Sequence, residues 1–235
     1  MEQQLARLPN LKADFRVFAF VFFFVSAYAQ ISIPAKQTGF WYEHRAAGVD
    51  SVLIEAFMDP VCPDSRDSWP PLKQALQHYG SRISLAVHPF PLPYHDNSFL
   101  CSRALHIVNN LNGSATYRLL EHFFEYQEDF YNKATFNLSR KSIVARVAEF
   151  AAKAVGSSLY DEIKSGFSNT ASDQATRFSF KYGCVKGVYG TPFFFLNGFP
   201  LPDAGSALTY KDWRGIIDPL VSEPETMVKP SHFLL

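Results

Sequence analysis

The chain has 235 residues with 22 basic and 22 acidic side chains, so its formal net charge is zero. This balance excludes the strong basic bias of nucleic-acid-binding proteins, and we expect no nucleic-acid partner. The length is sufficient for one large domain, or two small ones, with a real hydrophobic core.

The N-terminal segment predicts a secretory signal peptide over residues 1–29. Basic residues precede the apolar run 17–25, and the small residues of a cleavage site follow at 27–29. The apolar run is too short to span a bilayer, which needs about 20 residues. We therefore expect a mature chain of residues 30–235 in the ER lumen or outside the cell, with no stable membrane span. An uncleaved signal anchor is the alternative.

A strand, a helix and a second strand come first in the mature chain. The apolar run 51–58 predicts a buried strand, and the alternating run 82–88 predicts another. Residues 63–79 between them predict a helix, which we expect Pro70 and Pro71 to kink or break. Such a βαβ unit makes the two strands parallel and the crossover right-handed.

Helical periodicity dominates from about residue 98 to 182, where we expect four or five helices. Two short apolar runs, 193–196 and 199–201, then flank an Asn-Gly pair and predict a β-hairpin. A capping-box-like sequence at 209–212 starts a last helix. The order is βαβ, a helical block and ββα, which predicts an α/β protein with helices on both faces of one mixed sheet.

Cys62 lies at the junction of the first strand and its helix, in Cys62-Pro63-Asp64-Ser65. The unpaired N–H groups and the dipole of a helix N-terminus favour a thiolate there. Pro63 suits the first turn, where a missing N–H costs nothing. Nearby acidic residues such as Asp64 oppose the thiolate. Because Ser65 occupies the fourth position, the site has one sulfur and cannot close its own disulfide.

Around these residues the chain resembles the DsbA-like proteins of the thioredoxin superfamily. The matching stretches are Phe57-Met-Asp-Pro-Val-Cys-Pro-Asp-Ser65, Pro89-Phe-Pro-Leu-Pro-Tyr-His95 and Gly187-Val-Tyr-Gly-Thr-Pro-Phe-Phe-Phe-Leu-Asn-Gly198.

The resemblance implies a thioredoxin fold interrupted by a helical insertion, within a single domain of residues 30–235. The thioredoxin-like core would comprise 38–94 and 186–222, and the insertion 95–185. The resemblance also implies that Pro192 is a cis-proline facing Cys62. The backbone of Thr191 would then pair with an extended substrate as an added strand.

Two positions depart from the family's pattern. Ser65 replaces the resolving cysteine. Family members with a buried proton-relay carboxylate usually have it six residues before the nucleophile, where this chain has Ala56, and Glu55 lies one position earlier. A one-residue shift along a strand turns the side chain to the other face. Glu55 is therefore either a displaced proton acceptor or a solvated carboxylate at the strand edge.

A lone thiolate can attack a disulfide, but without a second cysteine at position 65 it cannot release the substrate by itself. Release must come from a substrate thiol, glutathione or a remote cysteine. This predicts isomerisation or glutathione-dependent exchange rather than net oxidation, on cysteine-containing polypeptides. The candidate catalytic residues are Cys62 and Ser65, the latter as a hydrogen-bond donor to the sulfur. The candidate substrate-binding residues are Pro63, Asp64, Thr191 and Pro192.

Two other functions remain open. The first is a redox-inactive thioredoxin-like module that binds extended polypeptides or partners through the proline loop. The second is a glutathione-conjugating or isomerising enzyme similar to the kappa-class transferases, which have Ser in the active site. The kappa-class transferases have a Gly-x-Asp sequence after the hairpin, whereas this chain has Pro202-Asp203 there. Glutathione as a co-substrate is the one small-molecule partner we expect.

Cys101 and Cys184 flank the helical block, and we predict that a structural disulfide between them pins it. Alternatively, one of them resolves Cys62, or both are free thiols. Asn112 and Asn137 lie in Asn-x-Ser sequons and are candidate glycosylation sites.

The histidines His88 and His95 do not indicate a metal site. His95 opens the helical block and could lie near Cys62, whereas His88 ends a strand and is expected in the core or at its edge. Neither histidine has a partner at ligand spacing, so we expect no metal site.

Overall fold

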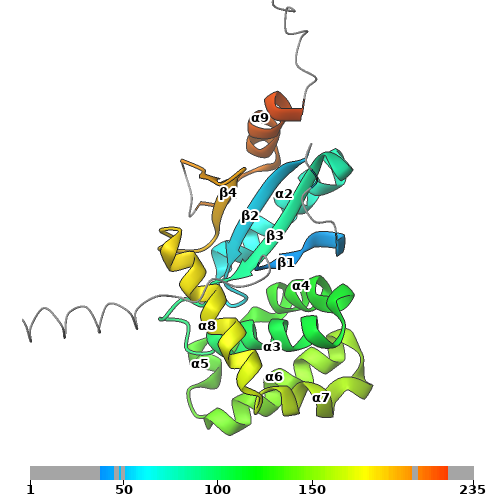
Figure 1. The fold of residues 1–235 in the computed structure, drawn as a ribbon. Coiled ribbons are helices and arrows are strands. Elements are labelled where there is room, and N and C mark those ends of the chain that lie inside the picture. The colour runs from blue at the N-terminus through cyan, green and yellow to red at the C-terminus, as the bar shows by residue number, and fades with distance from the viewer. Residues whose placement is uncertain (1–37, 45–47, 49–50, 203–205, 222–235) are drawn as a thin grey trace, which may run out of the picture. The chain divides into compact units, whose positions relative to one another are not determined.

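The computed structural model describes residues 38–44, 48, 51–202 and 206–221 (Figure 1). The predicted signal peptide, residues 1–29, lies outside these described residues. Within the described part of the chain, no helix is long and apolar enough to cross a membrane.

One mixed sheet organises the described residues, with the strand order β1-β3-β2-β4-β5. The central strands β2 (Val52–Met58) and β3 (Ile83–Pro89) are parallel, which confirms the predicted βαβ unit. Strand β1 (Phe40–Trp41) adds antiparallel to β3. The sequence analysis did not predict β1, because two residues are too few to show a period of two.

The C-terminal part of the sheet is the predicted hairpin. Strand β4 (Phe193–Leu196) pairs antiparallel with β2 and with β5 (Phe199–Pro200). Asn197 and Gly198 join the two strands with positive φ angles of 49° and 86°. Two consecutive positive φ angles match the twist of the strands, and Asn-Gly adopts them at low cost.

Helix α2 (Pro63–Tyr79) is continuous, so the predicted break at Pro70 and Pro71 is wrong. Each proline removes a hydrogen bond to the carbonyl four residues earlier, at Arg66 and Asp67. Pro70 is exposed and Pro71 is half-buried, so the lost bonds lie where solvent can replace them. The opposite face of the helix remains fixed in the core by Trp69, Leu72, Ala75 and Leu76.

Helices cover both faces of the sheet (Figure 1). Helix α2 packs with α9 (Tyr210–Val221) on one face, and α8 (Thr170–Val185) packs against β3 on the other. Because side chains alternate along a strand, Ile54 and Ala56 enter the core under α2, whereas Phe57 enters a second cluster on the α8 side.

The insertion between β3 and β4 contains six α-helices within the described residues, one more than expected. The additional helix, α5, is a single turn of four residues, which is too short to show helical periodicity. The helices are α3 (Ser98–Leu111), α4 (Thr116–Tyr126), α5 (Asn132–Thr135), α6 (Arg140–Val155), α7 (Tyr160–Gly166) and α8.

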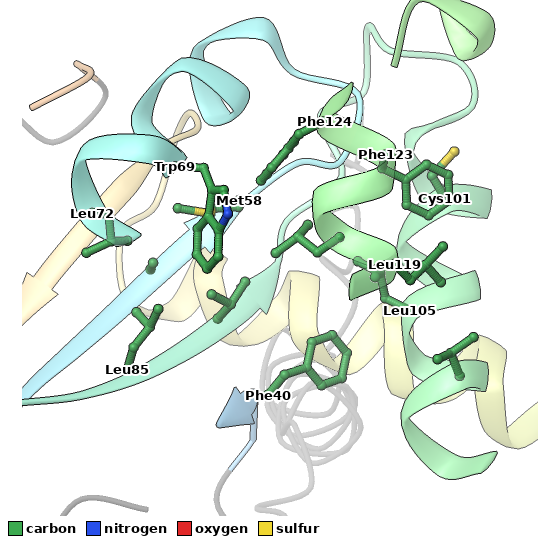
Figure 2. Close-up of a cluster of buried hydrophobic side chains, with 14 of the residues drawn as sticks. Phe40, Met58, Trp69, Leu72, Leu85, Cys101, Leu105, Leu119, Phe123 and Phe124 are labelled. Carbon is green, nitrogen blue, oxygen red and sulfur yellow. The ribbon is translucent and has the colours of Figure 1, made fainter. Parts of the chain in front are cut away.

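The insertion shares its hydrophobic core with the sheet. Figure 2 shows Met58 and Leu85 beside Trp69 of α2, with Leu105 and Phe123 of the insertion in the same cluster. The two parts therefore fold around one continuous core rather than as separate units.

We predict that His106, whose ring Nε2 is buried without a hydrogen-bond partner among the described residues, makes the fold sensitive to acid. Burial, with a smaller contribution from nearby His88, lowers the pKa of His106 from 6.5 to about 4. Between these two values the unfolded chain binds a proton that the folded chain does not, so stability falls as the pH falls. One such proton changes the free energy of unfolding by about 1.4 kcal/mol per pH unit.

Urea unfolding between pH 7 and pH 4 measures this slope. His106→Leu should flatten it, whereas His78→Gln, at an exposed site on α2, should leave it unchanged because the buried imidazoles stay in place. Equal slopes for the wild type and His106→Leu would contradict the prediction.

Candidate active site

Cys62 is the N-cap residue of α2, directly after the loop that leaves β2. Its backbone is extended (φ −83°, ψ 123°), and Pro63 begins the helix. The Cys62 carbonyl accepts the Arg66 N–H at 3.1 Å, the first bond of the helix. The sulfur thus lies at the helix end where unpaired N–H groups stabilise a negative charge.

The loop before β4 faces Cys62. The Thr191–Pro192 peptide bond is cis, the conformation that the resemblance implies. The Cys62 thiol donates a hydrogen bond to the Thr191 carbonyl oxygen at 3.4 Å. Cys62 is only 3% exposed, and its side chain belongs to the second cluster, which comprises Phe57, Cys62, Phe90, Leu92, Val188, Phe193 and Phe195.

Two tyrosines of different elements lie near the sulfur. Burial and then the charge of Cys62 raise the pKa of Tyr94, in the loop after β3. The pKa of Tyr131, in the insertion, is raised chiefly by burial and more weakly by Cys62. Tyr94 is 63% exposed, so an exposed aromatic side chain lies near the Cys62 sulfur.

Ser65 is fully buried, and within the described residues its hydroxyl makes no hydrogen bond to the Cys62 sulfur, contrary to the prediction. Its hydroxyl oxygen instead accepts the Asp59 N–H at 3.1 Å. Within the part of the chain that the structure describes, the hydrogen bond made by the Cys62 sulfur goes to Thr191. Ser65 therefore fixes the loop before Cys62 rather than the thiol itself.

Asp59 organises this loop, a role that sequence reasoning missed. Its carboxylate is fully buried. One oxygen accepts the Val61 N–H at 2.8 Å and the Ser98 hydroxyl at 2.6 Å. The other accepts the Leu92 N–H at 3.0 Å and pairs with His95 Nδ1 at 2.8 Å. The available signal was Asp59-Pro-Val, because Asp side chains often bind the N–H two residues on.

Gln127 in the insertion also supports the Cys62 loop and was missed as well. Its amide donates to the carbonyls of Cys62 at 3.2 Å and Pro60 at 3.4 Å. The Tyr131 hydroxyl donates to the Gln127 side-chain oxygen at 2.8 Å, which orients the amide. No local pattern indicates such a contact, because it joins segments 65 residues apart.

Glu55 is buried, so its interpretation as a solvated strand-edge carboxylate is wrong. It accepts hydrogen bonds from Tyr182 at 2.8 Å and Lys186 at 2.5 Å, and His88 Nε2 lies 3.5 Å away. Burial raises the pKa of Glu55, but its contacts with His88, Lys186 and Tyr182 lower it to about 2. A carboxylate with this pKa is a weak base, which also argues against a proton acceptor. His88 itself is buried and stacked on Phe57, as a core histidine is expected to be.

The predicted disulfide between Cys101 and Cys184 is not formed, and all three cysteines are free. Cys101 is fully buried on α3, and burial raises the pKa of its thiol well above the ordinary value. Cys184 is exposed near the end of α8. Both cysteines are therefore free thiols, which is one of the alternatives that the sequence left open.

The remaining candidate site residues differ in their exposure to solvent. Thr191 is buried at the site, and its hydroxyl has no hydrogen-bond partner among the described residues, whereas Asp64 is exposed on the first turn of α2. Asn112 and Asn137 are exposed, and glycosylation at either stays a prediction. In the described ranges, no group of three or more metal-ligating side chains is close enough to hold a metal ion.

No protein-family model and no curated protein matches this chain. Solved structures do match. A Pseudomonas syringae protein assigned as a protein-disulfide isomerase is 21% identical with a TM-score of 0.61, covering 71% of this chain and 93% of that chain. The catalytic domain of Proteus mirabilis ScsC is 19% identical with a TM-score of 0.56, covering 75% of this chain and 87% of that chain. MdbA, a thiol-disulfide oxidoreductase of Actinomyces oris, is 16% identical with a TM-score of 0.58, covering 76% of this chain and 84% of that chain.

At these low sequence identities, the structural similarity establishes the fold alone. The chain has the thioredoxin fold with a helical insertion, which is the architecture of DsbA-like proteins. The parallel pairing of β2 with β3 and the position of the insertion between β3 and β4 agree with the expectation from the sequence.

We predict that Asp59→Ala destabilises the protein by about 3 kcal/mol, because it leaves buried donors without an acceptor. Asp64→Ala, at an exposed carboxylate five residues along, should change stability by less than about 0.5 kcal/mol. Urea unfolding at pH 7 measures both. Equal unfolding midpoints for the two variants would show that Asp59 does not hold the loop.

Proposed function

We propose that this protein is a thiol–disulfide exchange protein with one active thiol, Cys62. The placement of the Cys62 sulfur carries the proposal: it lies at the N-terminus of α2 and contacts the Thr191 carbonyl beside Pro192. The helix end favours the thiolate. Two proteins of similar fold, assigned as a disulfide isomerase and named as a thiol-disulfide oxidoreductase, support the same chemistry.

The exchange begins when Cys62 loses its proton to solvent. The thiolate attacks one sulfur of a substrate disulfide, the substrate S–S bond breaks, and the other substrate sulfur leaves as a thiolate. A second thiolate then attacks the mixed disulfide and returns Cys62 as a thiolate. Ser65 cannot supply this second thiolate, and Cys101 is buried with a raised pKa.

The second thiolate in this proposal belongs to the substrate or to glutathione. The exposed Cys184 is the remaining alternative within the chain, and the variant Cys184→Ser tests it. A substrate thiolate gives isomerisation with no net oxidation, and glutathione gives glutathione-dependent exchange. The backbone beside Pro192 suits an extended polypeptide that pairs as an added strand, with Thr191, Pro63 and Asp64 around the bond. This chemistry and the predicted leader agree with an oxidising secretory compartment.

A redox-inactive binding module is the second candidate, and one observation favours it. The Cys62 side chain is nearly inaccessible to solvent, and its thiol donates a hydrogen bond to the backbone carbonyl of Thr191. A thiol held in this way is protected from attack. In this alternative, the loop around Pro192 binds extended polypeptides without the sulfur.

Alkylation read by mass spectrometry at each cysteine separates the two functions. If Cys62 is an active thiol, it should alkylate faster than Cys184 below pH 8, although Cys184 is the more exposed. Cys62→Ser should abolish exchange with a small disulfide, and Cys184→Ser should retain it. Slower alkylation of Cys62 than of Cys184 at every pH would overturn the exchange function and favour the binding module.

Restoring a second sulfur tests why Ser65 matters. Ser65→Cys should release a trapped substrate from Cys62 without added thiol, because two cysteines at the ends of one helical turn can close a disulfide. Ser68→Cys, one turn further along α2, should not. Mixed-disulfide lifetimes from non-reducing gels measure the difference. Equal lifetimes in Ser65→Cys and the wild type would rule out the missing sulfur as the limit on release.

A further inference from the structure

A pocket of about 410 Å³ opens between the loop that follows β3 and helix α8. Pockets that bind organic ligands have volumes of roughly 300–1,000 Å³. Its apolar walls include Leu92, Phe99 and Phe180, together with two prolines of the loop. Phe99 and Phe180 are half-buried, so each offers part of an aromatic ring to a bound group.

The pocket is joined to the candidate active site. Leu92 lines the pocket and packs in the second cluster with Cys62. His95 also lines it and is held by Asp59, whose backbone carbonyl accepts the Cys62 N–H at 3.1 Å. A polypeptide bound at Cys62 can therefore reach the pocket along the β3–α3 loop.

Among the residues that the structure describes, one cation on the rim of the pocket, Lys181, makes no ion pair. Arg177 pairs with Asp173 at 2.6 Å, and its guanidinium lies 5.7 Å from the centre of the Phe99 ring. Lys181 is exposed and has no ion-pair partner among the described residues. The acidic Asp96 also lies on the rim, so the positive charge is confined to the α8 side.

We propose that this pocket binds an aromatic side chain of an extended polypeptide, with an adjacent acidic residue that pairs with Lys181. The proposal rests on the proposed function, because it names a sequence preference for the polypeptides that meet Cys62. The aromatic walls recognise the ring through burial and edge contacts. The ammonium group of Lys181 attracts the carboxylate, and a neutral residue at the same position of the peptide would lack this attraction.

Peptide binding to the full chain carrying Cys62→Ser tests the pocket without any thiol chemistry. Three labelled ten-residue peptides would differ only in one pair, Phe-Asp, Ser-Asp or Phe-Lys. Replacing Phe by Ser should weaken binding about tenfold. Replacing Asp by Lys should weaken it by up to about fivefold. Fluorescence anisotropy gives the three dissociation constants.

Variants of the pocket identify where the preference arises. Adding Lys181→Glu should reverse the order of the Phe-Asp and Phe-Lys peptides, and Phe99→Ser should remove the advantage of Phe. Lys211→Glu, the same charge change at an exposed position of α9, should keep the original order. Equal binding of all three peptides, or the same reversal by Lys211→Glu, overturns the proposal. So does free phenylacetate bound as tightly as the Phe-Asp peptide, which would indicate a small acid as the ligand.

The wild type's exchange with a small disulfide distinguishes this proposal from the proposed function. If the wild type exchanges disulfides but the peptides show no difference in binding, the pocket proposal is overturned and the exchange function stands. A peptide preference without exchange supports the pocket and overturns the exchange function.

Discussion

Four hydrogen-bond donors converge on the buried carboxylate of Asp59, and the arrangement of the candidate site depends on them. They come from the loop after β2, the loop after β3 and the start of α3. A buried carboxylate is stable only when its oxygens are satisfied, so these segments must lie around it. Ser65 then accepts the Asp59 N–H, which ties the first turn of α2 to the same loop. Cys62, three residues after Asp59, is positioned as a consequence.

The insertion contributes to both sides of the site. Gln127 binds the Cys62 loop, and α8 leads directly to the loop with Pro192. The end of α8 is held to the sheet by the Lys186 and Tyr182 contacts with Glu55. Close packing of α8 also requires Gly183, since a Cβ there would lie 2.5 Å from the Phe90 ring. The helical block is therefore part of the scaffold of the site, although its sequence alone shows only amphipathic helices.

Local patterns predicted most of the elements. The alternation and length of the two apolar runs specified the parallel strands, and Asn197-Gly198 specified the hairpin. The errors occurred where the local signal was weak or was overridden. The two prolines of α2 were expected to break it, but burial of the opposite face maintains the helix. β1 and α5 are too short to carry a period.

The sequence by itself determined the fold class, the position of Cys62 at a helix N-terminus and the absence of a second sulfur at position 65. These follow from short-range periodicity and from residue identity. Only the tertiary structure decided the partners of the polar and sulfur groups: Asp59 with His95, Glu55 with Lys186, Ser65 with the Asp59 backbone, and three free cysteines. The physical reason is that the Asp59–His95 and Glu55–Lys186 contacts join distant segments of the chain, and that the carboxylate of each pair is buried. Neither the distance nor the burial is encoded in any local pattern.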